Sequence, residues 1–111
     1  MPTDPNRTRA TEEFVRRLRQ DLPEHIVSLR LFGSEVRGQA TSESDIDILV
    51  VVQPDEQRVA LETRVVDIAF DVNLAFNVFV SPSVVTPAIL NHPVWGETPF
   101  IETVLREGVA L

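Results

Sequence analysis

The sequence lacks three residue types that carry much of enzyme chemistry, because its 111 residues include no cysteine, no lysine and no tyrosine. The absence of cysteine excludes disulfides, thiol nucleophiles and cysteine-ligated zinc. The absence of lysine excludes Schiff bases and a Walker-type phosphate lysine. Only two histidines, His25 and His92, are present, and both are expected in loops, so a histidine-rich metal site is disfavoured. Chemistry must therefore come from carboxylates, hydroxyls, arginine, backbone groups and bound metal.

Acidic residues clearly outnumber basic residues in this sequence. Ten basic residues, all arginine, stand against 17 acidic ones, for a net charge of −7. This acidic balance argues against a nucleic-acid-binding surface, which needs a basic stripe to contact phosphates. The longest apolar runs fall well short of the roughly 18 residues of a membrane span, and the start MPTDPNRTRA has no secretory core. We expect a cytoplasmic protein that does not bind membranes.

The hydrophobic pattern predicts alternating helices and strands. In chain order, we expect a flexible tail over 1–6, a helix over 8–22, a strand over 26–32, a helical turn and loop over 34–44, a strand over 45–52, a helical stretch from Pro54, a strand over 77–80, proline-rich turns with one short helix over 82–99, a helix over 99–107 capped by Gly108, and a tail over 109–111. This order predicts one α/β (α+β) domain over 1–111, with a small mixed sheet of three to four strands and helices packed on it.

Two segments indicate where the core lies. Residues 45–52, DIDILVVV, are continuously apolar after their start, which is typical of a strand covered on both faces. The helical stretch after Pro54 carries one apolar stripe, formed by Leu61, Val65, Ile68, Val72 and Ala75. Trp95 lies between two turn residues and is expected either to fill the core or to anchor an interface.

The chemistry is concentrated in residues 31–52, LFGSEVRGQATSESDIDILVVV. Gly33 and Ser34 directly follow a predicted strand, where glycine allows close backbone approach and serine suits a phosphate oxygen. Asp45 and Asp47 begin the next strand, and residues two apart on a strand share a face, about 6.6 Å apart. Two carboxylates on one face repel each other unless cations are bound, and Mg²⁺ prefers such oxygen ligands. The spacing therefore predicts a two-metal site for phosphoryl or nucleotidyl transfer.

Gly33-Ser34, followed after ten residues by Asp45-x-Asp47, resembles the signature of the DNA polymerase β-type nucleotidyltransferase superfamily. The chain is most similar to its minimal prokaryotic members, and the Arg-Gly pair at Arg37 matches their loop. The resemblance implies a nucleotidyltransferase-like fold. It implies that Gly33, Ser34 and Arg37 bind the phosphates of ATP or another NTP. It also implies that Asp45 and Asp47 are catalytic and hold Mg²⁺.

The same resemblance implies a partner protein. A chain of this size has no room for a separate acceptor domain, and minimal nucleotidyltransferases typically act as antitoxins beside a HEPN-family toxin. The expected activity is transfer of a nucleoside monophosphate, AMP from ATP, to a hydroxyl on that partner, within a homo- or hetero-oligomer. Because the chain has no tyrosine, a tyrosine acceptor would have to be supplied in trans.

One position departs from the superfamily pattern. Active members place a third carboxylate on a later strand, where this sequence has Ser81, and Asp67 and Asp71 lie on the polar side of the preceding helix. An alternative function is therefore a catalytically weakened antitoxin that binds nucleotide and neutralises its partner by complex formation alone. A phosphatase of the haloacid-dehalogenase type, which also uses Asp-x-Asp, is disfavoured by the short chain and the missing lysine. Arg37 has an alternative too, a surface salt bridge to Glu35 or Glu43.

Overall fold

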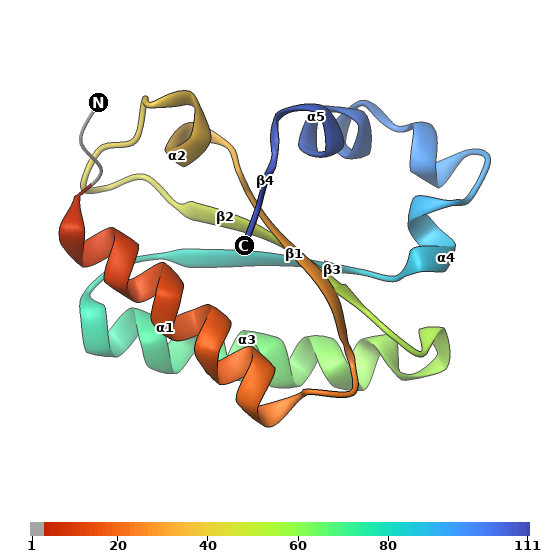
Figure 1. The fold of residues 1–111 in the computed structure, drawn as a ribbon, viewed down its shortest axis with the longest axis horizontal. Coiled ribbons are helices and arrows are strands. Elements are labelled where there is room, and N and C mark those ends of the chain that lie inside the picture. Colours follow the sequence, from red (N-terminus) through yellow and green to blue (C-terminus); the bar gives the residue numbers. More distant parts are fainter. Residues whose placement is uncertain (1–3) are drawn as a thin grey trace.

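The computed structural model describes residues 4–111 and folds them into a mixed four-stranded sheet with helices on both faces (Figure 1). Its elements are α1 (Pro5–Asp21), β1 (Ile26–Phe32), α2 (Ser34–Arg37), β2 (Ile46–Val52), the 3₁₀ turn η1 (Asp55–Gln57), α3 (Arg58–Phe76), β3 (Val80–Val85), α4 (Pro87–Leu90), the 3₁₀ turn η2 (Trp95–Glu97), α5 (Pro99–Glu107) and β4 (Val109–Ala110). The fold class predicted from the sequence is confirmed.

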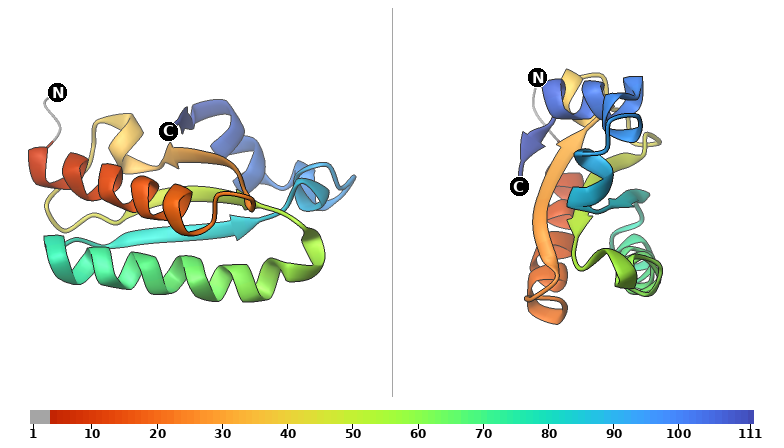
Figure 2. Two further views of the ribbon diagram at one scale, coloured as in Figure 1. Left: turned by 60° about the horizontal axis from the view of Figure 1, so that its bottom comes forward. Right: turned by 90° about the vertical axis from the view of Figure 1, so that its right-hand side faces the viewer.

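The sheet has the strand order β3-β2-β1-β4. β1 pairs antiparallel with both β2 and β4, whereas β2 and β3 run parallel and are joined by α3. Figure 2 shows α1 and α3 on one face of this sheet and α2 and α5 on the other. The central position of β2 therefore fixes which of its side chains face each layer.

Alternation along β2 divides the core into two parts. Ile46, Ile48, Val50 and Val52 belong to the larger apolar cluster, which packs on α1 and α3. Leu49 and Val51 face the other way and pack with Val104 of α5. All six side chains are buried, so the prediction of a strand covered on both faces is confirmed. By the same alternation, Asp45 and Asp47 lie on the α5 side of the sheet.

The first helix begins earlier than its apolar spacing predicts. The side chain of Asp4 accepts a hydrogen bond from the Asn6 amide at 2.8 Å, and Pro5 occupies the first helical position. Capping and proline thus make residues 4–6 the start of α1, which corrects the predicted tail over 1–6; residues 1–3 lie outside the described residues.

The third strand was predicted over 77–80 and broken by Ser81-Pro82, and this prediction is wrong. Asn77 ends α3 with a left-handed φ of 54°, and β3 begins at Val80 and continues through Pro82 to Val85. Proline is compatible with this strand because β3 lies at the edge of the sheet and has a partner on one side only. The shift brings Ser81 into the sheet.

The C-terminal segment also differs from the prediction. The helix over 99–107 is confirmed, and Gly108 follows it with φ −65°, so it ends the helix in an extended rather than a left-handed conformation. That extended exit leads into β4, where a tail was predicted. Val109 and Ala110 pair with Leu31 and Arg30 of β1 and close the free edge of that strand.

α3 is apolar on two opposite sides. Of the predicted stripe, Leu61, Val65 and Val72 are buried and Ile68 is partly buried. Ala75 was predicted to belong to the stripe but is exposed, whereas Ala69 is buried and was not predicted. The outer side carries the exposed side chains Val59, Val66, Phe70 and Leu74.

Across residues 4–111, no helix is both long and apolar enough to span a bilayer.

Candidate active site

The glycine–serine turn joins β1 directly to α2. Gly33 has φ 76° and ψ −150°, a conformation that side-chain-bearing residues rarely adopt. Its carbonyl accepts hydrogen bonds from the amides of Val36 and Arg37, each at 3.2 Å. A Cβ atom built on Gly33 would overlap the carboxylate of Asp47. The turn therefore touches Asp47, so the structure brings together two parts of the motif that lie 14 positions apart in the sequence.

Asp47 is the second residue of the inner strand β2, flanked by a residue from each neighbouring strand. Its register partners are Phe32 on β1 and Ser81 on β3. Asp45 is exposed just before β2, and the buried Ile46 between them points into the opposite layer. The two carboxylates therefore share the face that the sequence predicted, next to the Gly33 turn.

The electrostatics of this face are unfavourable to a second negative charge. Burial raises the pKa of Asp47 above its ordinary value of 3.8, and repulsion by Asp45 raises it further. Arg37 lowers this pKa and Glu35 raises it, both more weakly than burial and Asp45 do. A partly buried carboxylate that is repelled by its neighbour is the environment that a bound divalent cation relieves.

The third carboxylate is missing from the site itself. Ser81 lies beside Asp47 in the parallel ladder, so its hydroxyl is on the face where a third acid would be needed. Among residues 4–111, the structure holds no cluster of three or more histidine, cysteine or acidic side chains that could bind a metal. Two carboxylates still fit Mg²⁺, because this ion commonly takes one or two carboxylates and completes its shell with water and substrate phosphates.

Arg37 is exposed at the end of α2. Its Nη1 lies 3.6 Å from Oε2 of Glu107 on α5, and its Nε donates to Oε1 of Gln39 at 3.4 Å. The surface salt bridge considered for Arg37 thus exists, but with Glu107 rather than with Glu35 or Glu43. Because an exposed ion pair is worth little, this arginine can exchange Glu107 for a bound phosphate.

Arg7 was missed by the sequence analysis and supports the site from below. It is 4% exposed, forms an ion pair with Glu35 of α2, and extends Nη2 to the carbonyl of Asp45 at 3.5 Å. Its Nη1 has no hydrogen-bond partner among the residues that the structure describes. Removing one partner of such a buried pair typically costs about 3–5 kcal/mol. Arg7 thus ties α2 and the start of β2 to α1.

A signal for Arg7 was present in the sequence. It shares one side of α1 with Ala10, Phe14 and Leu18, all buried, at spacings of three and four residues. An arginine in line with a core-facing stripe is rarely solvated, so it needs a buried acidic partner.

A small sheet that presents two aspartates beside a glycine–serine turn offers oxygen ligands for a divalent cation next to backbone that can approach a phosphate closely. The sequence model of the nucleotidyltransferase domain family matches residues 11–94. The chain is also 34% identical over 107 residues to "Putative protein adenylyltransferase MJ0604" of Methanocaldococcus jannaschii, covering 96% of this chain and 98% of the relative. The chain belongs to the nucleotidyltransferase domain family.

Solved structures agree on the fold. "Structure of putative minimal nucleotidyltransferase" matches with a TM-score of 0.60 at 29% identity, over 98% of this chain and 97% of that one. "Crystal structure of the toxin-antitoxin with AMP-PNP" matches with a TM-score of 0.58 at 22% identity, over 89% of this chain and 69% of that one. The second likeness concerns the fold alone.

The contact between Gly33 and Asp47 predicts a specific loss of nucleotide binding. Gly33→Ala places a methyl group against the Asp47 carboxylate and should weaken binding of a non-hydrolysable ATP analogue by at least about tenfold, which corresponds to about 1.4 kcal/mol of binding free energy. Gly38→Ala is the comparison variant, because Gly38 lies exposed at the far end of α2 with φ 70° and ψ 22°, a left-handed conformation that costs alanine about 1–2 kcal/mol. Isothermal titration calorimetry measures both affinities. Equal losses in the two variants would show that a general disturbance of α2, and not the position of Gly33 beside Asp47, weakens binding.

Proposed function

We propose that this chain is a Mg²⁺-dependent adenylyltransferase that moves AMP from ATP to a hydroxyl on a partner protein, as the antitoxin of a toxin–antitoxin pair with a HEPN-family toxin. The observation that carries the proposal is the contact of the Gly33 turn with Asp47, on the face that Asp45 shares. The relative named as a protein adenylyltransferase supports AMP and a protein acceptor. The solved toxin–antitoxin structure named with AMP-PNP supports a nucleotide and a partner.

The residues of the site divide the work of binding. The turn at Gly33 and the Ser34 hydroxyl would hold the β- and γ-phosphates, and Arg37 would neutralise one of them after leaving Glu107. Asp45 and Asp47 would hold Mg²⁺. When bound, the ion supplies positive charge that stabilises the charge developing on the phosphates.

The reaction requires one bond to form and one to break. The acceptor hydroxyl oxygen attacks the α-phosphorus, the bond from that phosphorus to the bridging oxygen breaks, and pyrophosphate leaves. The hydroxyl proton must pass to a base. Ser81, beside Asp47, does not supply a carboxylate for this step, so the base would come from the acceptor protein or from solvent.

The same Ser81 favours a second candidate function. If no base reaches the acceptor hydroxyl, the chain would bind nucleotide and neutralise its partner by complex formation alone. The two candidates share a site and differ in whether the mass of the partner changes.

The transfer reaction is tested with the protein encoded by the adjacent gene as acceptor. Incubation with ATP and Mg²⁺ should add one AMP to that protein, measured by intact mass spectrometry. Asp45→Asn and Asp47→Asn should each slow transfer by roughly 100- to 1,000-fold, as loss of one electrostatic group in an active site does. Asp67→Asn and Asp71→Asn, which change exposed aspartates of α3, serve as controls and should leave the rate unchanged. Transfer that survives both site variants contradicts the proposal, as does a stable complex whose acceptor never gains mass.

The role of position 81 is tested by restoring the acid. Ser81→Asp places a carboxylate beside Asp47 and should raise the transfer rate at least tenfold, since general bases contribute roughly 10²–10⁴-fold. Ser83→Asp is the control, because Ser83 pairs with Leu49 farther along the same strands. Activity that appears only in Ser81→Asp would establish the weakened antitoxin as the natural state. A Ser81→Asp rate no higher than that of Ser83→Asp would show that the missing carboxylate does not limit transfer.

A further inference from the structure

An apolar cavity lies at the end of the sheet face that carries the aspartates. Its volume is about 300 Å³, and its walls are Val85, Ile89, Trp95, Thr98, Phe100 and Ile101. Val85 is four residues beyond Ser81 on β3, so both side chains are on the same face of the sheet. The ring of Phe100 packs edge-to-face on Phe32 at 5.6 Å, and Phe32 is the register partner of Asp47. A continuous path of side chains thus joins the cavity to the candidate active site.

Trp95 forms the outer wall of the cavity and is exposed. Its side chain is 59% exposed and that of Phe100 is 46% exposed, so of the two alternatives for Trp95, the core-filling one is excluded. The side chain of His92 holds the backbone at Trp95 in place. Its Nδ1 accepts hydrogen bonds from the backbone amides of Val94 and Trp95, at 3.0 and 3.2 Å. An exposed aromatic side chain on a fixed backbone loses little entropy on binding and is typical of an interface anchor.

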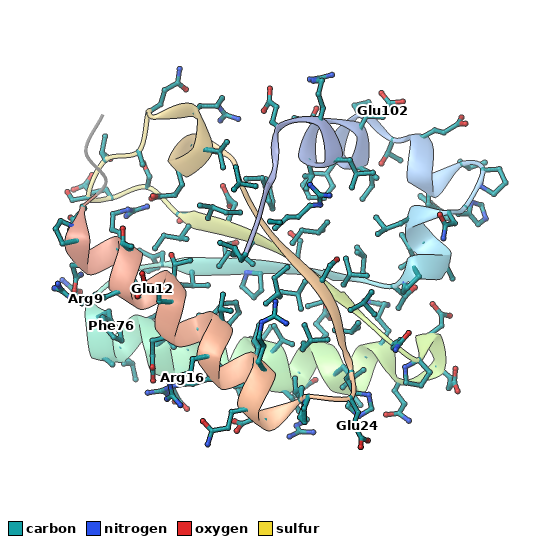
Figure 3. All side chains as sticks on the ribbon, viewed as in Figure 1. Arg9, Glu12, Arg16, Glu24, Phe76 and Glu102 are labelled. Atoms are coloured by element: carbon teal, nitrogen blue, oxygen red, sulfur yellow. The ribbon has the colours of Figure 1, made fainter. Side chains whose placement is uncertain are left out.

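The charges next to the cavity are acidic. Glu97 precedes the wall residue Thr98, and Glu102 follows Ile101 and projects outward from α5 (Figure 3). Both are exposed, and no ion pair to either occurs among residues 4–111. An apolar cavity whose wall residues are followed or preceded by exposed acidic residues is complementary to an apolar side chain flanked by arginine or lysine.

We propose that this cavity binds an apolar or aromatic side chain from a basic segment of the acceptor protein and thereby selects the hydroxyl that reaches the active site. This inference rests on the proposed function, because it requires an acceptor protein. Ser81 and Val85 are about 13 Å apart along β3, so in an extended segment the anchor side chain is about four residues from the modified residue. The occupant is part of the acceptor, and the nucleobase and a second copy of this chain are the alternatives that the test distinguishes.

The test separates acceptor binding from nucleotide binding and from chemistry. Transfer of AMP to the protein encoded by the adjacent gene is measured against acceptor concentration and, separately, against ATP concentration. Trp95→Ala should raise the KM for the acceptor by about 10- to 30-fold, the effect of truncating an aromatic anchor, and leave kcat and the KM for ATP within about twofold. Trp95→Phe should recover most of the affinity. Phe70→Ala is the matched control, since Phe70 is 61% exposed on α3, across the sheet.

Each outcome bears on one proposal. An unchanged acceptor KM in Trp95→Ala overturns the docking cavity and leaves the transferase intact. A raised KM for ATP in Trp95→Ala assigns the cavity to the nucleobase and overturns it as an acceptor site. A change in the oligomeric state of Trp95→Ala on gel filtration assigns the cavity to a second copy of this chain and likewise overturns the proposal. If wild type transfers no AMP, the affinity of the complex is measured by calorimetry. Weaker binding by Trp95→Ala than by Phe70→Ala then keeps the cavity as a docking site for the partner, while the transferase proposal and the selection of a hydroxyl both fail. Equal binding, or none, overturns the cavity as well.

Discussion

The candidate site depends on the repulsion between Asp45 and Asp47, which β2 imposes on the chain. Ile46, between them, is fixed in the α1 and α3 layer by complete burial, so both carboxylates must share the opposite face. Burial and this neighbour raise the pKa of Asp47. Two carboxylates placed side by side destabilise the fold, and proteins retain such pairs mainly at functional sites. A carboxylate with a purely structural role would instead be paired with a positively charged side chain. The fold thus holds a place for positive charge, which Arg37 offsets only weakly.

Other parts of the structure keep this arrangement in position. Arg7 extends from α1 to Glu35 and to the carbonyl of Asp45, and so links the helix after the glycine–serine turn to the start of β2. Gly33 allows the turn to touch Asp47. Arg37 is held at the rim by an exposed pair with Glu107, which is weak enough to exchange. A buried ion pair at Arg7 and an exposed, exchangeable one at Arg37 would suit the proposed binding and release of a charged nucleotide.

The sequence predicted those parts of the fold and site that follow from local patterns. The strand over 26–32 and the helix near 99–107 agree with the observed bounds, because alternation, proline and capping residues mark them locally. β3 was misplaced because proline tolerance depends on being an edge strand, which is a property of the assembled sheet. Arg7 was missed because its partner lies 28 positions away. The face shared by the two aspartates followed from strand geometry, whereas the exposure of Trp95 depends on how α4, η2 and α5 pack.

The relation between charge and metal is tested most directly by the free energy of unfolding of Asp47→Asn with and without Mg²⁺. The folded-state pKa of Asp47 lies above the unfolded value of 3.8, so stability falls as pH rises through the folded pKa, and the ionised side chain destabilises the fold at pH 7. In chelator, urea unfolding at pH 7 should show Asp47→Asn to be more stable than wild type, with the difference vanishing below pH 3.8. Added Mg²⁺ should stabilise wild type and not the variant. A variant less stable than wild type in chelator, or stabilised equally by Mg²⁺, would contradict the account.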